Sequence, residues 1–291
     1  MTRWTERRVR YREILQGKRC VHPGSVFDPM SIRIAESVGY ELGMFAGSTA
    51  SLTVLGAPDI IVLTLSEFAD QALRINRAGR IPLMVDADHG YGNAMNVMRT
   101  VEELEIAGIA GMSIEDTVLP LAFGAVGQPS GKPGLISVEE GVGKMRAALQ
   151  ARTDKSLIIA GRTSAPQLTT VTDAIARGKA YAATGVDAMF YVGVKTRADL
   201  DAIAAEIKIP LILGGSSPDL LDRDYLAGRG VRVALQGHQP IQAAVRAIHA
   251  TMQALRDGTP PAKLEGLASA ELMKIATRAE DYERWTKDFL S

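Results

Sequence analysis

The sequence predicts an α/β protein, a single (β/α)8 TIM barrel that spans residues 1–291 and ends in additional C-terminal helices. Eight short apolar segments typical of strands alternate with amphipathic helical segments along the chain. No linker rich in Pro, Gly or Ser separates them, and polar residues gather after the carboxyl ends of the strand segments. A doubly wound open sheet would show the same alternation, so the number of strands alone does not exclude that fold.

The element boundaries follow from the apolar pattern and from helix-capping residues. Strands are predicted at residues 21–26, 42–46, 82–86, 110–114, 157–161, 187–192, 210–213 and 231–235. Helices are predicted at residues 29–38, 66–79, 95–107, 137–151, 168–184, 197–207, 218–228 and 239–256. Ser137 followed by Glu139 and Glu140 is typical of a capped helix start, and Gly108 and Gly185 stand where helices should end.

A further helix is predicted after the eighth helical segment, at residues 269–278. Beyond it, Tyr282, Trp285 and Phe289 are spaced by three and four residues, which places their rings on one face of a helix. That face could pack against the chain's own barrel or against a neighbouring subunit, and the sequence favours neither alternative.

The composition is typical of a soluble globular protein. Of the 291 residues, 46% are hydrophobic and 23% are charged, and the formal net charge is zero. This balance argues against electrostatic binding to nucleic acid or to a membrane surface. No apolar run is long enough for a signal peptide or a membrane span, and the single cysteine, Cys20, excludes an internal disulfide. We therefore expect a cytoplasmic protein.

Residues 81–93 are the most informative segment, because an apolar strand there ends in Asp86 and Asp88. Alternate side chains of a strand share one face, so we expect these two carboxylates to point the same way. Glu115 follows the next strand, and Asp59 adds a further acid. Acids gathered at one point need a cation, and hard oxygen ligands suit Mg²⁺, or Mn²⁺, rather than a metal that prefers thiols. The simpler alternative is a polar turn after a strand.

Mg²⁺ usually keeps several waters, so one aspartate is expected to bind the metal directly while the other acids hold its water ligands. Arg162 follows the fifth strand beside this cluster, and its planar guanidinium suits a substrate carboxylate. Alternatively, Arg162 forms a salt bridge with Glu115 or Asp116. The predicted catalytic residues are Arg162, His238 and Asp59.

Two further polar positions lie at strand ends on the same rim. Ser48 and the backbone amides around Gly47 could bind an anion, although small residues there also suit a tight turn. His238 follows the eighth strand and could contact the distal end of a substrate, although a histidine can also cap a strand end structurally. The opposite ends of the strands read as ordinary turns, so the polar rim is the predicted active site.

These segments resemble the isocitrate lyase/phosphoenolpyruvate mutase superfamily over roughly residues 15–255. The likeness is carried by a metal signature at 85–93, a second acidic element at 113–117 and an arginine strand at 159–165, with residues 26–31, 47–48 and 56–59. Within the superfamily the chain is most similar to bacterial oxaloacetate decarboxylases, on residues 25–30, 64–68, 93–101, 138–144 and 237–238.

The resemblance implies roles for the residues of the rim. Asp86 would bind Mg²⁺ directly, and Asp88 and Glu115 would act through water. The substrate would be a small 2-oxo acid. The residues that would hold it are Ser48 and Arg162 at its carboxylate and His238 at its other end.

The resemblance also implies an assembly. Members of the superfamily are typically homotetramers, built as dimers of dimers in which the eighth helix is swapped between subunits. Residues 239–291 would then lie at a subunit interface. No nucleic acid or membrane partner is expected.

The segment after the fourth strand departs from the superfamily's lyases. Those enzymes carry a catalytic cysteine in a loop here, whereas residues 119–135 contain neither cysteine nor histidine. The predicted function is therefore Mg²⁺-dependent decarboxylation of oxaloacetate, or of a close 3-carboxy-2-oxo acid, to pyruvate and CO₂ through a metal-stabilised enolate, which needs no protein nucleophile. The alternatives are another carbon–carbon or carbon–phosphorus lyase or hydrolase, similar to 2-methylisocitrate lyase or phosphonopyruvate hydrolase, and a non-catalytic metabolite-binding barrel.

Overall fold

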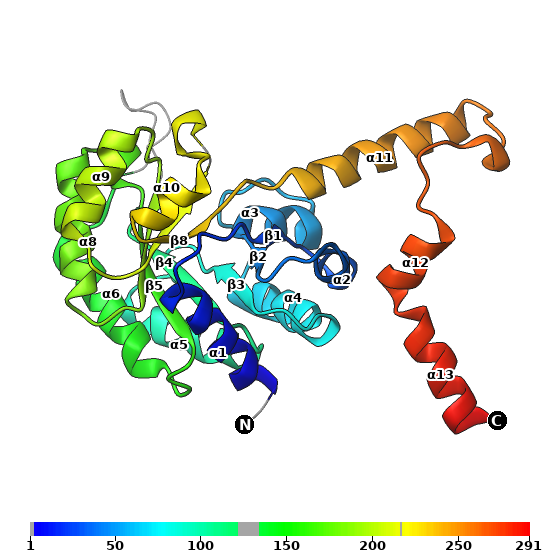
Figure 1. Ribbon diagram of the computed structural model, residues 1–291, viewed down its shortest axis with the longest axis horizontal. Helices are drawn as coiled ribbons and strands as arrows, with labels where there is room; N and C mark the ends of the chain where they lie inside the picture. The colour runs from blue at the N-terminus through cyan, green and yellow to red at the C-terminus, as the bar shows by residue number, and fades with distance from the viewer. Residues whose placement is uncertain (1–2, 122–133, 216) are drawn as a thin grey trace.

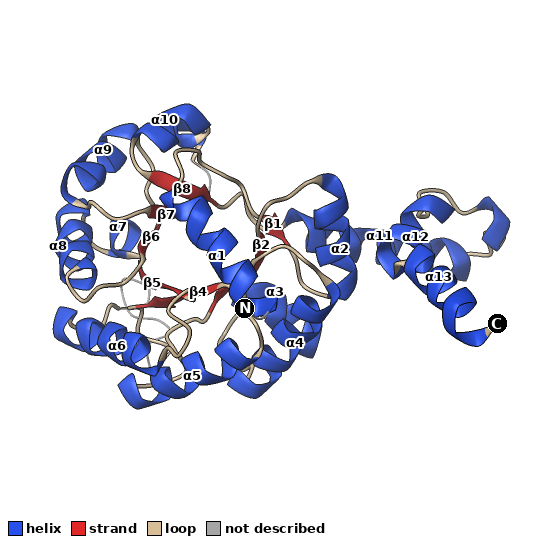
Figure 2. Cartoon of the chain, turned by 60° about the horizontal axis from the view of Figure 1, so that its bottom comes forward, coloured by secondary structure: helices blue, strands red, loops and turns tan. Residues whose placement is uncertain are grey.

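The computed structural model describes residues 3–121, 134–215 and 217–291. Residues 122–133, which belong to the segment that departs from the lyases, therefore lie outside the described part. Eight parallel strands are hydrogen-bonded to one another in chain order (Figure 2). They are β1 (Gly24–Ser25), β2 (Gly43–Phe45), β3 (Leu83–Asp86), β4 (Gly111–Glu115), β5 (Ile158–Thr163), β6 (Ala188–Val192), β7 (Leu211–Gly214) and β8 (Val231–Ala234). Each lies within one of the predicted strand segments or extends it by one or two residues.

The two edges of the sheet meet just before β1, which closes the sheet into a barrel. Val21 forms a parallel bridge with Val233. The Val21 N–H donates to the carbonyl of Arg232 (2.9 Å), and the Val21 carbonyl accepts from the N–H of Ala234 (3.0 Å). The predicted (β/α)8 fold is therefore confirmed, and the open sheet is excluded.

Alternation of side chains along the strands separates two apolar clusters. Residues such as Met44 and Ile158 face inward and fill the barrel. Residues such as Val85 and Ile159 face outward and pack against the surrounding helices. The neighbours Ile158 and Ile159 thus belong to different clusters. The interior is a packed core, which leaves the open rims of the barrel as the places for a site.

Helix α1 (Arg3–Gln16) covers the amino-terminal end of the barrel and is absent from the predicted elements. Its residues Tyr11 and Leu15 pack into the interior cluster. Its buried arginines bond to backbone carbonyls: Arg7 Nη1 donates to Asn76 O (2.7 Å), and Arg8 Nε donates to Ile109 O (3.0 Å). Charged side chains of α1 are buried because they bond to backbone carbonyls. The helix therefore lacks a clear apolar stripe, the pattern from which a buried helix is normally predicted.

The helices that alternate with the strands agree with the prediction within a few residues. They are α2 (Pro29–Val38), α4 (Leu65–Ala78), α5 (Ala94–Ile106), α6 (Val138–Ala151), α8 (Val171–Ala182) and α9 (Arg197–Glu206). Helix α10 (Arg223–Gly228) begins later than predicted, because Pro218–Leu220 forms a separate 3-10 turn, η2. Three short helices were not predicted: α3 (Gly47–Ala50) and the π-helical η1 (Ser51–Leu55) after β2, and α7 (Ala165–Leu168) after β5.

The C-terminal helices extend away from the barrel (Figure 1). Helix α11 (Gln239–Arg256) has the predicted bounds but buries only Ile241. After the 3-10 turn η3 (Pro261–Lys263), α12 (Ala270–Thr277) returns to α2, where Arg33 Nη1 donates to the carbonyl of Ala276 (2.9 Å).

The aromatic side chains near the end lie on α13 (Ala279–Leu290). Tyr282 and Trp285 form an edge-on pair with ring centroids 5.2 Å apart. Tyr282 is 58% exposed and Phe289 is 76% exposed, so the chain's own barrel does not cover this face. Of the two alternatives for this aromatic face, packing against the chain's own barrel is therefore wrong. Packing against a neighbouring subunit stays a prediction.

Candidate active site

The predicted rim surrounds a cavity of about 650 Å³ at the carboxyl ends of the strands. Five predicted residues line it: Ser48, Asp59, Asp86, Arg162 and His238. The remaining predicted residues, Gly47, Asp88 and Glu115, are immediate neighbours of this lining. Residues far apart in the sequence are thus brought together, as the barrel topology predicts.

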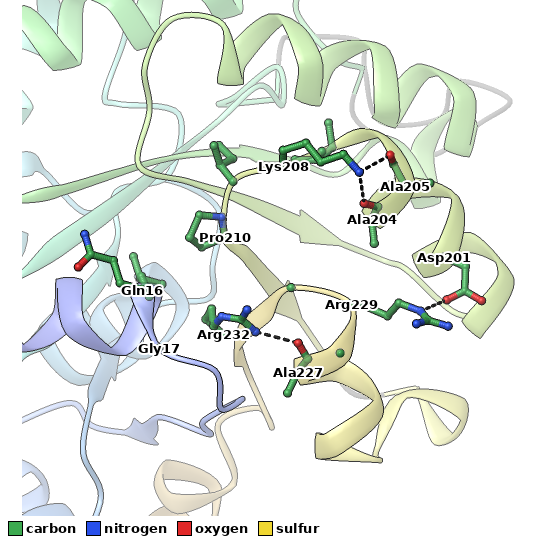
Figure 3. Close-up of a pocket in the computed structure, with 15 residues that line it drawn as sticks. Gln16, Gly17, Asp201, Ala204, Ala205, Lys208, Pro210, Ala227, Arg229 and Arg232 are labelled. Carbon is green, nitrogen blue, oxygen red and sulfur yellow. Dashed lines mark hydrogen bonds and ion pairs between the residues drawn. The ribbon is translucent and has the colours of Figure 1, made fainter.

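A larger cavity, of about 810 Å³, lies at the opposite end of the barrel between α9, α10 and the end of α1 (Figure 3). Its cations are engaged at helix ends: Lys208 Nζ donates to Ala205 O (2.6 Å), and Arg232 Nη1 donates to Ala227 O (2.9 Å). Arg229 pairs there with Asp201. This end carries helix-capping contacts that serve stability, so the acidic rim is the candidate active site.

The acidic cluster is built by a sharp turn after β3. The strand ends at Asp86, and Asp88 adopts a left-handed backbone with φ of 47°. The Asp88 N–H donates to Asp86 Oδ1 (3.1 Å), and the Asp88 carbonyl accepts from the N–H of Glu115 (2.8 Å). The two aspartates thus belong to one acidic cluster, as expected, but the turn after β3, and not strand alternation, directs Asp88.

Gly47 leaves room for the Asp88 carboxylate. A Cβ atom on Gly47 would stand 2.7 Å from Asp88 Oδ1 and 2.9 Å from Asp88 Oδ2, which is closer than side chains tolerate. Gly47 thus has a packing role beside Asp88, while its predicted contact with a substrate anion stays a prediction. The next residue, Ser48, is half-buried and lines the cavity.

The carboxylates carry more negative charge than their surroundings balance. Burial, together with Asp86, Asp59 and Glu115, raises the pKa of Asp88 well above its usual value. Burial also raises the pKa of Glu115, and partial removal from water with the charge of Asp86 raises that of Asp59. Within the described residues, these acids gather around Arg162, and the exposed Lys195 also lines the cavity. Such an excess of hard oxygen donors fits a divalent cation.

The acids fit a cation that keeps its waters. In the described part of the chain, no three His, Cys, Asp or Glu side chains converge closely enough to bind a metal by themselves. A cation held by one or two carboxylates and several waters is compatible with these side chains. Thr117 Oγ1 donates to Glu115 Oε2, which orients that carboxylate.

Arg162 is the next-to-last residue of β5 and lies among the acids. Its Nη1 pairs with Asp86 Oδ2 and lies 3.7 Å from Glu115 Oε1, and its guanidinium carbon stands 5.4 Å from the centroid of the Phe190 ring. The alternative of a salt bridge to Glu115 is thus partly realised. Asp116, the other alternative partner, pairs instead with Arg177 (3.1 Å). The buried Nε of Arg162 has no hydrogen-bond partner among the described residues, so a donor remains for a ligand.

His238 lines the cavity beyond Arg162. Its Nδ1 lies 2.8 Å from Ser25 Oγ, and its side chain makes no helix-capping bond to α11. Burial lowers the pKa of His238, and the charges of Asp86 and Asp59 oppose that shift. Burial therefore favours the neutral imidazole over the imidazolium, and the ring lines the cavity without capping α11.

Sequence reasoning missed several residues that support the site. Phe190 stacks beneath Arg162, Ser25 bonds His238, and the buried Lys144 donates from Nζ to the carbonyl of His89 (3.0 Å). Ser25 ends the first strand on the same rim, so its position could have revealed it. The role of Lys144 could not be predicted. The apolar pattern of its helix, α6, does not show that one side chain contacts the turn after β3.

Comparison with known proteins identifies the family. The model of the phosphoenolpyruvate phosphomutase family matches residues 12–256. The chain belongs to this family. It is an enzyme, and the predicted superfamily is confirmed.

The similar proteins match along nearly the whole chain. Oxaloacetate decarboxylase of Bradyrhizobium diazoefficiens is 56% identical over 284 residues, which are 98% of this chain and 97% of that protein. Oxaloacetate decarboxylase of Rhodopseudomonas palustris (strain BisA53) is 55% identical over 287 residues, 99% and 98% of the two chains. The solved structure of a phosphonopyruvate hydrolase with oxalate and Mg²⁺ has a TM-score of 0.83 and 26% identity, and covers 100% of both chains. Within the described residues, no helix combines the length and apolar character needed to cross a membrane.

Proposed function

We propose that this enzyme decarboxylates oxaloacetate, or a close 3-carboxy-2-oxo acid, to pyruvate and CO₂. The observation that carries the proposal is one cavity in which an acidic cluster and Arg162 stand at one side and His238 completes the lining. Such a cavity suits an acid with a carboxylate at each end. The relatives named oxaloacetate decarboxylase, 55–56% identical over nearly the full chain, support this substrate.

The residues of the rim also fit Mg²⁺, or Mn²⁺. Asp86 would hold the metal directly, and Asp88 and Glu115 would hold its waters. When bound, the metal supplies positive charge that stabilises the negative charge developing on the 2-oxo oxygen. Support comes from the unbalanced acids and from the phosphonopyruvate hydrolase structure that contains Mg²⁺.

The chain's own residues position the substrate. Arg162, through its free Nε–H, and Ser48 would bind the C1 carboxylate, while His238 would bind the C4 carboxylate. When the C3–C4 bond breaks, its electron pair forms the enolate and CO₂ leaves. Arg162 remains beside the developing charge, and a proton from water at C3 gives pyruvate. Asp59, an exposed residue of the cavity lining, would orient that water.

Chelation and one aspartate substitution test the proposal. Oxaloacetate turnover, followed by pyruvate formation and corrected for enzyme-free controls with the same Mg²⁺, should vanish with EDTA and return with Mg²⁺. Asp86→Asn should lower kcat/KM by about 100-fold or more, because it removes the direct ligand. The control Asp201→Asn changes an acid at the opposite end of the barrel and should leave turnover unchanged.

The same assay separates the alternatives. Faster turnover of phosphonopyruvate or 2-methylisocitrate than of oxaloacetate would favour another lyase or hydrolase of the family. Tight oxalate binding without turnover of any of these acids would favour a metabolite-binding barrel. Full activity of Asp86→Asn, or activity that EDTA leaves intact, would contradict the role given to the acids.

We also propose that the chain assembles as a homotetramer, a dimer of dimers that exchange α11. A barrel of this type normally packs a helix after each strand, whereas α11 follows β8 and points away from its own barrel (Figure 1). Four large apolar side chains of α11 are exposed: Val245, Ile248, Met252 and Leu255. A second copy of the chain is the partner that has this helix to exchange.

A further inference from the structure

We infer that Ser25 is a positioning residue that holds His238 in the tautomer with its proton on Nε2, so that the ring presents an N–H donor to the distal carboxylate of the substrate. The inference rests on the proposed function and adds to it. It assigns a second residue to the end of the cavity that recognises the C4 carboxylate.

The contact joins the first and last strands of the barrel. Ser25 is the final residue of β1, and His238 follows β8. The Val21–Val233 bridge closes the barrel at this seam and brings the two side chains together. Ser25 Oγ lies 2.8 Å from His238 Nδ1, and in the described part of the chain the hydroxyl makes no other hydrogen bond. Among the described residues, Ser25 Oγ and His238 Nδ1 therefore have each other as their only hydrogen-bond partner.

A serine hydroxyl can donate or accept, so the electric field must decide the direction of the bond. The acids Asp59 and Asp86 line the cavity together with His238. Nδ1 is engaged by Ser25, which leaves Nε2 as the ring nitrogen available to the cavity, and the negative charge of the acids favours a proton there. The Ser25 hydroxyl then donates to Nδ1.

His22 provides an internal contrast. Its Nδ1 lies 2.7 Å from the carbonyl of Ala234, which can only accept. His22 must therefore carry its proton on Nδ1, the opposite tautomer to that inferred for His238. The chain has four histidines, and the other two are His89 and His249.

The consequence for catalysis is specific. Without the hydroxyl, Nδ1 of His238 has no partner, the tautomers mix, and the donor toward the C4 carboxylate is lost for part of the molecules. Ser25→Ala should lower kcat/KM by about tenfold, mostly through KM, the size expected for one hydrogen bond to a charged group. Ser25→Thr, which keeps a hydroxyl, should retain most of the activity.

The test is a tautomer measurement on the full-length chain labelled with ¹⁵N-histidine. Long-range ¹⁵N–¹H correlations distinguish the tautomers, and His22→Gln and His238→Gln assign the signals. His238 is expected as the Nε2–H form in the wild type and as a mixture in Ser25→Ala, with Ser25→Thr restoring the wild-type pattern. His22 should remain in the Nδ1–H form in every variant. Circular dichroism and thermal unfolding check that Ser25→Ala is folded.

Three results would overturn the inference: an Nδ1–H form of His238 in the wild type, an unchanged His238 signal in Ser25→Ala, or undiminished kcat/KM in Ser25→Ala despite a changed tautomer. The control Ser37→Ala removes an exposed hydroxyl that bonds within α2, and it should change neither measurement. The tautomer readout needs no turnover. If no candidate acid is decarboxylated, the proposed function fails while the tautomer still decides the Ser25–His238 pair.

Discussion

At the scale of single residues, the acidic cluster depends on Gly47, and the reason is the space beside it rather than its backbone conformation. Gly47 matters because the Asp88 carboxylate occupies the space of its missing side chain. A methyl group there would displace a flexible carboxylate rather than the backbone. The fold should therefore tolerate the change better than the metal site does.

Gly47→Ala should accordingly weaken Mg²⁺ binding by about 10–100-fold while changing the free energy of unfolding little. Displaced Asp88 can no longer hold the waters of the metal. The measurement is Mn²⁺ titration followed by electron paramagnetic resonance, with Mg²⁺ competition. The matched control is Gly143→Ala in α6, where an added Cβ meets open space and should raise stability by about 0.5–1 kcal/mol. Equal metal affinities in the two variants would remove the role given to the Gly47–Asp88 packing.

The residues that could be predicted are those whose position alone places them at the site. Asp86, Arg162 and His238 each lie at or just beyond the carboxyl end of a strand, and parallel strands bring such residues to one rim. The orientation of Asp88 could not be predicted, because its left-handed backbone depends on bonds to β4. The bond from Ser25 to His238 likewise requires knowing that the first and last strands meet.

At the scale of elements, α1 shows how buried charge supports a helix that the apolar pattern misses. Arg8 Nη1 donates to Asp154 Oδ2 (2.9 Å), and Thr5 Oγ1 donates to the same oxygen (3.0 Å). Burial alone would raise the pKa of Asp154, but these bonds and the N–H of Ser156 lower it to about 2. The ionised Asp154 therefore fixes α1 to the amino end of the barrel.

The stability that this bond network provides should depend on pH. The pKa of Asp154 in the folded chain lies below its ordinary value of 3.8, so the contribution is present above pH 3.8 and is lost as pH falls toward 2. Asp154→Asn should lower the free energy of unfolding by about 1–2 kcal/mol at pH 7, and the difference from the wild type should shrink below pH 4. Denaturant unfolding at a series of pH values measures both.

Asp70→Asn is the matched control, because Asp70 pairs with Arg74 on the exposed face of α4. Such an exposed pair contributes little, so this variant should follow the wild type at every pH. A constant gap between Asp154→Asn and the wild type from pH 7 to pH 3 would show that ionisation of Asp154 does not stabilise α1.

At the scale of the whole molecule, the bounds of α11 follow from the sequence but its direction does not. The apolar stripe predicts a helix at 239–256, and the structure confirms those bounds. The stripe of Val245, Ile248 and Met252 nevertheless remains exposed in the single chain. An apolar stripe in the sequence predicts that this face of the helix is buried. It does not show whether the burying surface belongs to the same chain or to another copy.

The exposed stripe of α11 leads to the last prediction. Ile248 is 55% exposed in the single chain, and if helices are exchanged it becomes buried against a second barrel. Ile248→Asp would place a carboxylate in that interface without an ion partner, so the variant should form smaller assemblies than the wild type. Light scattering coupled to size-exclusion chromatography measures the mass of each. Ala250→Asp, which adds the same charge on the opposite, exposed face of α11, should assemble as the wild type does. A wild type that is monomeric, or an Ile248→Asp protein with wild-type mass, would mean that α11 projects for a reason other than exchange between subunits.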